Sequence, residues 1–110
     1  DIYYEINLSL PQYSNLNFIS NSVYIPNVGN AGIIVVNSGT GFLAWDAADP
    51  NRPNTPCSVL TISGLEASSS CADQNTYNLI TGQSVGVALI CSLRPYRVES
   101  SGNILVITSF

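Results

Sequence analysis

The stretch that decides the fold reads Ile33-Ile34-Val35-Val36-Asn37-Ser38-Gly39-Thr40-Gly41-Phe42-Leu43-Ala44-Trp45. Two apolar runs flank five residues that include two glycines. Glycine adopts the left-handed backbone conformations that a hairpin connection needs, so the stretch predicts two antiparallel strands. Because side chains alternate across a strand, one face of the second strand should be buried and the other less so. The two faces are Leu43 with Trp45, and Phe42 with Ala44.

Alternation of apolar and polar residues, bounded by turn residues, continues along most of the chain and is typical of β-strands. On the first strand one face should carry Ile2, Tyr4, Ile6, Leu8 and Leu10. Further strands are expected at 23–25, 58–62, 76–80, 86–93, 96–99 and 104–109. No stretch of ten or more residues combines helical apolar spacing with a convincing cap. The sequence therefore predicts an all-β protein with a single domain over residues 1–110.

The charged residues argue against two classes of partner. They make up 9% of the chain, with three arginines, no lysine and seven carboxylates, for a net charge of −4. Such a chain lacks the basic surface that binds nucleic acid or an anionic membrane. No apolar run approaches the roughly 18 to 20 residues of a membrane-spanning helix, so no transmembrane segment is expected.

The remaining composition predicts export. The chain is poor in lysine and rich in Asn, Ser and Thr, which fits a periplasmic or cell-surface protein better than a cytosolic one. Any leader or lipid anchor would lie upstream of Asp1.

Two irregular stretches interrupt the strand pattern. The first reads Asp49-Pro50-Asn51-Arg52-Pro53-Asn54-Thr55-Pro56. Three prolines in eight residues prevent continuous ladder pairing and predict a rigid loop. A second loop is expected from Glu66 to Asn75. Loops that project from a β scaffold are the usual place for a site.

Three segments resemble the frame of Rieske-type [2Fe–2S] domains. They run from Ala44 to Asn51, from Tyr77 to Gln83 and from Leu93 to Glu99. The resemblance covers the chain from about the hairpin to the C-terminus. It implies a small Rieske-like antiparallel β-sandwich with two projecting loops.

The resemblance also assigns the positions of cluster ligands. In that family the first loop carries Cys-x-His and the second Cys-x-x-His. Here the first pair of positions holds Asp49 and Asn51, and the second holds Ser70 and Asp73. If the second loop is shifted by one residue, its pair becomes Cys71 and Gln74.

These residue types do not suit a Rieske cluster. The chain contains no histidine, and neither register supplies more than one cysteine. Asp and Asn offer hard oxygen donors, whereas sulfide-bridged iron favours thiolates and the Rieske centre needs imidazole. A cluster held by the three cysteines and an aspartate is less favoured still, because Cys91 falls in the expected strand 86–93. We therefore expect no bound cofactor and no metal.

The cysteines have a different interpretation. Respiratory-type Rieske domains carry a disulfide that clamps the two cluster loops, and the resemblance implies the same pair here, Cys57 with Cys71. A disulfide argues for an oxidising compartment. The alternative is three reduced thiols in the core, since free cysteine is often buried. Cys91, which alternates with Leu89 and Leu93, is interpreted as such a core thiol.

Other chemistries find weaker support. Oxygen donors suited to a hard cation such as calcium occur at Asp46, Asp49, Asn51 and Asp73, but their spacing matches no dedicated loop and such residues usually satisfy turns. Ser68 to Ser70 offer hydroxyls without a histidine or lysine to activate them. A carbohydrate-stacking platform could be built from Trp45, Tyr77 and Tyr96, although aromatic residues in strands are more often packed in the core.

The sequence thus predicts a Rieske-like module without a cluster, exported, with a binding or structural role and no catalytic activity of its own. Its partner, a protein or a glycan, is not identified by the residues. The alternative function is electron transfer by a Rieske-type [2Fe–2S] protein with non-standard ligands. Visible absorption separates the two, because a bound [2Fe–2S] centre is coloured.

Overall fold

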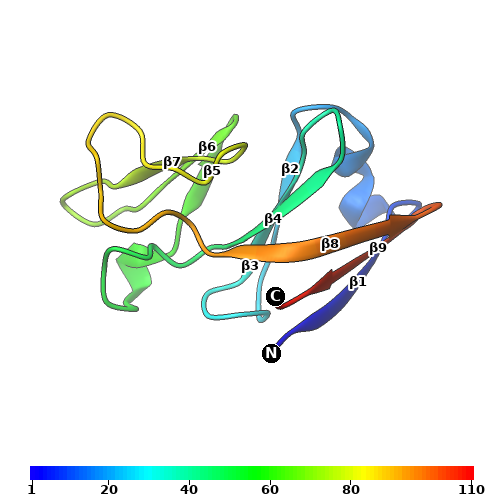
Figure 1. Ribbon diagram of the computed structural model, residues 1–110, viewed down its shortest axis with the longest axis horizontal. Helices are drawn as coiled ribbons and strands as arrows, with labels where there is room; N and C mark the ends of the chain where they lie inside the picture. The colour runs from blue at the N-terminus through cyan, green and yellow to red at the C-terminus, as the bar shows by residue number, and fades with distance from the viewer.

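The computed structural model describes residues 1–110 and shows a mostly β protein with two antiparallel sheets, drawn in Figure 1. The larger sheet has the order β1 (Tyr3–Asn7), β9 (Ile104–Thr108), β8 (Pro95–Ser101), β4 (Phe42–Asp46), β3 (Ile33–Asn37) and β2 (Ser22–Ile25). The smaller sheet contains β5 (Thr61–Ser63), β6 (Glu66–Ser68) and β7 (Thr76–Asn78). Two short 3₁₀ helices are η1 (Pro11–Asn17) and η2 (Pro56–Ser58). The predicted all-β class is confirmed, and no helix is long and apolar enough to cross a membrane.

The hairpin β3–β4 forms as predicted, with Val35 opposite Ala44 and Ile34 opposite Trp45. Gly39, at the turn, adopts a positive φ of 91°, which a residue with a side chain rarely tolerates. The expectation of a single buried face is wrong. Ala44 is 2% exposed and Trp45 8% exposed although they point to opposite faces, because both sides of the hairpin are covered.

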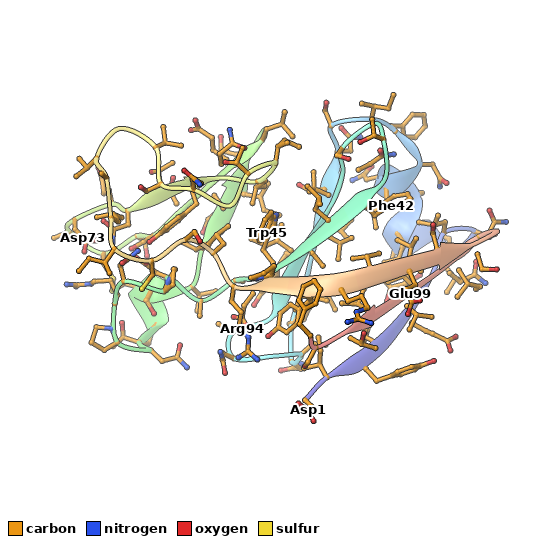
Figure 2. The ribbon with its side chains drawn as sticks, in the orientation of Figure 1. Asp1, Phe42, Trp45, Asp73, Arg94 and Glu99 are labelled. Atoms are coloured by element: carbon orange, nitrogen blue, oxygen red, sulfur yellow. A yellow bond between two sulfur atoms is a disulfide. The ribbon has the colours of Figure 1, made fainter.

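Two cores lie on the two sides of this hairpin. On one side the larger sheet curves around a core formed by Ile6, Leu8, Leu16, Ile25, Ile33, Val35, Ala44, Tyr96, Leu105 and Ile107. On the other side the smaller sheet packs against the hairpin through Ile34, Val36, Trp45, Ala47, Leu60, Ala67, Tyr77, Leu79 and Leu93. Figure 2 shows Trp45 between the two sheets. The hairpin is therefore the structural link between them.

Three expected elements differ from the structure. The strand expected at 58–62 is shifted, because Pro56–Ser58 forms η2 and β5 covers Thr61–Ser63. Residues 66–68 were expected in a loop but form β6, the central strand of the smaller sheet. Residues 86–93 do not form the expected strand and instead belong to the irregular connection between β7 and β8, yellow to orange in Figure 1. Leu93 is buried and Leu89 partly buried against the core of the smaller sheet. Because Leu89 and Leu93 point into the core at an even spacing, this loop has the same alternation of apolar residues as one face of a strand.

Candidate functional site

Two loops meet beside the smaller sheet. The first loop (residues 47–55) leads from β4 to η2, and the second loop (residues 69–75) connects β6 to β7. The backbone N–H of Ser70 donates to the carbonyl of Cys57 at 3.0 Å. Next to this bond, Cys57 and Cys71 form a disulfide with their Cα atoms 4.9 Å apart. The clamp that the resemblance implies is present.

Asp49, the first of the cluster-ligand positions, is only 2% exposed. One carboxylate oxygen accepts hydrogen bonds from the hydroxyl of Tyr77 and, at 3.0 Å, from the backbone N–H of Asn51. The other accepts from the side-chain amide of Asn75 at 3.0 Å. Tyr77 belongs to β7 and Asn75 to the second loop. The buried carboxylate therefore joins both loops to the smaller sheet.

Asn51, the second position, holds the third loop (residues 85–93). Its side-chain nitrogen donates to the Tyr77 hydroxyl at 2.7 Å and to the Cys91 carbonyl at 2.8 Å. Its side-chain oxygen accepts from the Cys91 backbone N–H at 2.9 Å. An amide side chain can both donate and accept, so a single residue satisfies both backbone groups of Cys91.

The Tyr77 hydroxyl lies at the centre of this network. Burial raises its pKa, and the hydrogen bond to Asp49 raises it further, while the bond from Asn51 lowers it. The net effect is a raised pKa of Tyr77. Its hydroxyl therefore stays protonated at neutral pH and donates a hydrogen bond to Asp49. We call these four side chains, Asp49, Asn51, Asn75 and Tyr77, the polar network.

The two ligand positions of the second loop lie outside the polar network. Ser70 is exposed and its hydroxyl donates to the Cys57 carbonyl at 3.3 Å. Asp73 pairs with Arg52 at 3.2 Å, the only ion pair of the chain. Both charged side chains are more than a third exposed, and surface pairs of this kind contribute little to stability.

The residues present do not fit a [2Fe–2S] cluster. Asp49 and Asn51 have their polar atoms engaged in the network, and Ser70 and Asp73 bring no thiolate or imidazole. In the shifted register, Cys71 is held in the disulfide and Gln74 has no soft donor. No group of three or more His, Cys, Asp or Glu side chains is arranged to hold a metal ion. No buried side-chain nitrogen or oxygen lacks a hydrogen-bond partner, so no buried polar atom is left for a ligand to satisfy.

The four oxygen donors considered for a hard cation do not converge on one site, although Asp49 and Asn51 share the polar network. Asp46 faces elsewhere and accepts from the Tyr96 hydroxyl at 2.6 Å, from the Asn30 backbone at 2.8 Å and from the Ala48 backbone at 2.9 Å. Asp73 pairs with Arg52. Each carboxylate is thus satisfied by separate protein donors.

The favoured interpretation of the aromatic residues is confirmed, because Trp45, Tyr77 and Tyr96 are 8%, 0% and 5% exposed and lie in the core. The alternative, a carbohydrate-stacking platform, is wrong. The interpretation of Cys91 as a core thiol is also wrong. Cys91 is exposed and free on the third loop. Leu89 and Leu93, with which it alternates, pack against the core from an irregular backbone.

Sequence reasoning missed two partners of the ligand positions, Asn75 and Arg52. Both are polar residues of loops, and their local sequence carries no signal of the bond they form. Asn75 reaches Asp49 across 26 residues. Only the packing of the two loops creates these contacts.

The comparisons with known proteins bear on the fold. No protein-family model matches the chain, and no curated protein matches it in sequence. Among solved structures, the chain is similar to the "Ferredoxin of carbazole 1,9a-dioxygenase from Nocardioides aromaticivorans IC177", with a TM-score of 0.58 and 14% sequence identity. The match covers 87% of this chain and 93% of that chain. At this identity the likeness concerns architecture alone, and it shows that the chain has a Rieske-like fold.

Proposed function

We propose that this chain is a Rieske-like module without an iron–sulfur cluster that serves a binding or structural role outside the cytosol. It has no catalytic activity of its own in this proposal. A single observation carries it: the positions that would hold the cluster are used to close the loops on each other.

The closure supports a structural use of the former ligand positions. Asp49 binds the second loop through Asn75, and Asn51 binds the third loop through the backbone of Cys91. The disulfide adds a covalent link between the first two loops, Cys57 to Cys71. Ligation of iron by Asp49 would require breaking the buried hydrogen bond from the Tyr77 hydroxyl, and an orphaned buried group costs about 1–3 kcal/mol.

The third loop supports a binding role. Two apolar side chains of this loop are exposed to solvent, Val87 at 70% and Ile90 fully. Asn51 fixes the backbone directly beside Ile90, so the apolar side chains project from a held loop. A rigid apolar tip suits contact with another protein, because little conformational entropy is lost on docking.

The disulfide supports export. Disulfides persist in oxidising compartments and are rare in the reducing cytosol. Periplasmic or cell-surface placement is therefore part of the proposal. The absence of an activated catalytic nucleophile is a separate part. The three serines at 68–70 have no histidine or lysine in the chain to activate them.

Anaerobic reconstitution with ferrous iron and sulfide tests the proposal. After desalting, the protein should carry no stoichiometric iron, show no visible [2Fe–2S] absorption and give no paramagnetic signal on reduction. A cluster-holding ferredoxin treated in the same way is the control for the procedure. Stoichiometric iron with a reduced-state signal would contradict the proposal and favour the electron-transfer alternative.

A ligand-restored variant tests the assignment of positions. It carries Asp49→Cys, Asn51→His, Ser70→Cys and Asp73→His together, with Cys57 and Cys71 unchanged. If these positions correspond to the family's ligands, the variant should gain visible absorption under conditions in which the natural chain stays colourless. A variant that keeps the native circular dichroism spectrum and still takes up no iron would contradict the assignment.

A further inference from the structure

A pocket of about 610 Å³ lies away from the three loops, between the start of β1, the loop that connects β2 to β3, and the start of β8. Its volume falls within the range of about 300–1,000 Å³ that is typical of small-molecule sites. Its lining includes Asp1, Asn27, Gly29, Asn30, Arg94 and Tyr96. Figure 2 shows Arg94 where β8 begins, near the β2–β3 loop.

Arg94 places a positive charge beside this pocket, and the ring of Tyr96 holds it in position. Its guanidinium carbon lies 5.4 Å from the centroid of the Tyr96 ring, within the range of a cation–π contact. The only ion pair of the chain is Arg52 with Asp73, so Arg94 has no ion-pair partner, although Asp1 also lines the pocket. A guanidinium carries five N–H donors in a planar fork that matches a carboxylate or a phosphate. The stacked fork without an ion-pair partner therefore points to an anionic ligand.

The floor of the pocket is fixed before any ligand binds. The Tyr96 hydroxyl donates to buried Asp46, which also accepts from the backbone of Asn30. Gly29 has a φ of +68°, and a Cβ there would lie 2.6 Å from Asp46 Oδ2 and 2.7 Å from the Tyr96 hydroxyl. Only glycine permits this close approach of the loop. Preorganisation of this kind lowers the entropic cost of binding.

The polar groups around Arg94 select among anions. Asn27 and Asn30 line the pocket, and an asparagine amide can donate to and accept from hydroxyl groups. One guanidinium balances one negative charge, and Asp1 in the lining and Asp46 at the floor already place negative charge near Arg94. A dianionic phosphate would leave excess negative charge in this field. A monocarboxylate with several hydroxyls matches Arg94 and the two asparagines better than a dianionic phosphate does.

We propose that this pocket binds a small hydroxylated monocarboxylate such as a sugar acid. Arg94 takes the carboxylate in a bidentate pair, and the amides of Asn27 and Asn30 bind hydroxyls. The pocket shares no residue with the polar network, so its test is independent of the cluster question.

Titration of the ¹⁵N-labelled protein with D-galacturonate tests the assignment. The backbone amides of Val28, Gly29 and Asn30 should show saturable shifts. Galactose, which lacks the carboxylate, should bind at least about tenfold more weakly, and inorganic phosphate should bind more weakly than galacturonate. The absence of saturable galacturonate shifts would overturn the proposal. Equal binding of galactose would show that the carboxylate is not recognised, and tighter binding of phosphate would show a general anion site; either result would overturn it.

A matched pair of variants isolates Arg94. Arg94→Gln should lower galacturonate affinity at least about tenfold. Arg97→Gln removes the same charge from a guanidinium that stacks at the same distance, 5.4 Å, over Phe110 and does not line the pocket; it should change affinity less than about twofold. Equal losses in both variants would overturn the proposal, because they would show a long-range charge effect.

Arg94→Lys is the second test, for use if Arg94→Gln alters the fold. It keeps the positive charge but loses the planar fork of donors. Unchanged galacturonate affinity in Arg94→Lys would overturn the bidentate pair.

Discussion

Replacement of Trp45 by alanine should be among the most destabilising single changes in this chain. The indole is 8% exposed in the core that joins the two sheets, and its Nε1–H donates to the Leu79 carbonyl at 2.7 Å. The substitution removes a large buried side chain, leaves a cavity and orphans that carbonyl. Trp-to-Ala changes of this type cost about 3–5 kcal/mol in unfolding free energy, out of the roughly 5–15 kcal/mol typical of a domain.

Urea unfolding followed by far-ultraviolet circular dichroism measures this loss. The midpoint should fall with little change in the slope, since the same surface is exposed on unfolding. A loss below about 1 kcal/mol would refute the placement of the indole in the core and would favour an exposed ring at Trp45.

Replacement of Gly82 tests the position of the Trp45 ring, because Gly82 lies directly against it. It adopts a φ of +76°, and a Cβ there would lie 2.6 Å from Cζ3 of Trp45. Gly82→Ala should therefore combine backbone strain of about 1–2 kcal/mol with overpacking of about 1–3 kcal/mol. Gly64→Ala is the matched control, because Gly64 has a φ of +61° but no atom within 4 Å of its Cβ position. A Gly82→Ala variant no less stable than Gly64→Ala would contradict the contact with Trp45.

Two further predictions concern the covalent clamp and the buried tyrosines. Cys57→Ser with Cys71→Ser should lower stability by about 3 kcal/mol, as expected for opening a link of 14-residue separation, and should leave the strand scaffold folded; unchanged thermal stability would contradict this. Non-reducing peptide mapping should link Cys57 to Cys71 and leave the exposed Cys91 free to react with a thiol reagent in the native protein, and Cys91 found in the bridge would exclude the clamp. Burial and the bond to Asp46 raise the pKa of Tyr96 to about 12, and burial and Asp49 raise that of Tyr77. A tyrosine whose pKa is raised on folding stabilises the folded state fully below its unfolded pKa of 10.0 and loses that contribution as the pH rises through the folded value. Stability should thus decline from about pH 10 upward, and Tyr96→Phe should decline less steeply; equal slopes in urea titrations at several pH values would refute this.

The sequence pattern located most strands of the larger sheet. β1, β8 and β9 lie where the alternation of apolar residues placed them, and the hairpin β3–β4 lies where two apolar runs flank a turn with glycines. The same signal failed at residues 86–93, where Leu89 and Leu93 pack from an irregular loop. A period of two reports which side chains are buried, and does not report whether the backbone between them is paired. β6 was missed for the opposite reason, since Glu66-Ala67-Ser68 contains only one buried side chain.

The disulfide between the loops could be predicted, but the other contacts between them could not. The resemblance pointed to Asp49 and Asn51 and to the loops that carry them, and it implied the disulfide that the structure contains. It could not reveal that Asn51 would bind the backbone of Cys91, 40 residues further along the chain. Hydrogen bonds between distant loops depend on the final packing, which local sequence does not encode. The pocket beside Arg94 was missed for the same reason.

The residue types at Asp49 and Asn51 also explain how the three loops are held together. Ordered loops need contacts that offset the conformational entropy lost by their backbone. Asn51 meets this need with an amide that donates to and accepts from one backbone unit, and Asp49 meets it with a carboxylate that accepts from both the sheet and the second loop. Single replacement of Asn51 by histidine would lose one of the two bonds to Cys91, because a neutral imidazole has its donor and acceptor on opposite sides of the ring. The present residues therefore stabilise a closed arrangement that restoring a single ligand would disturb.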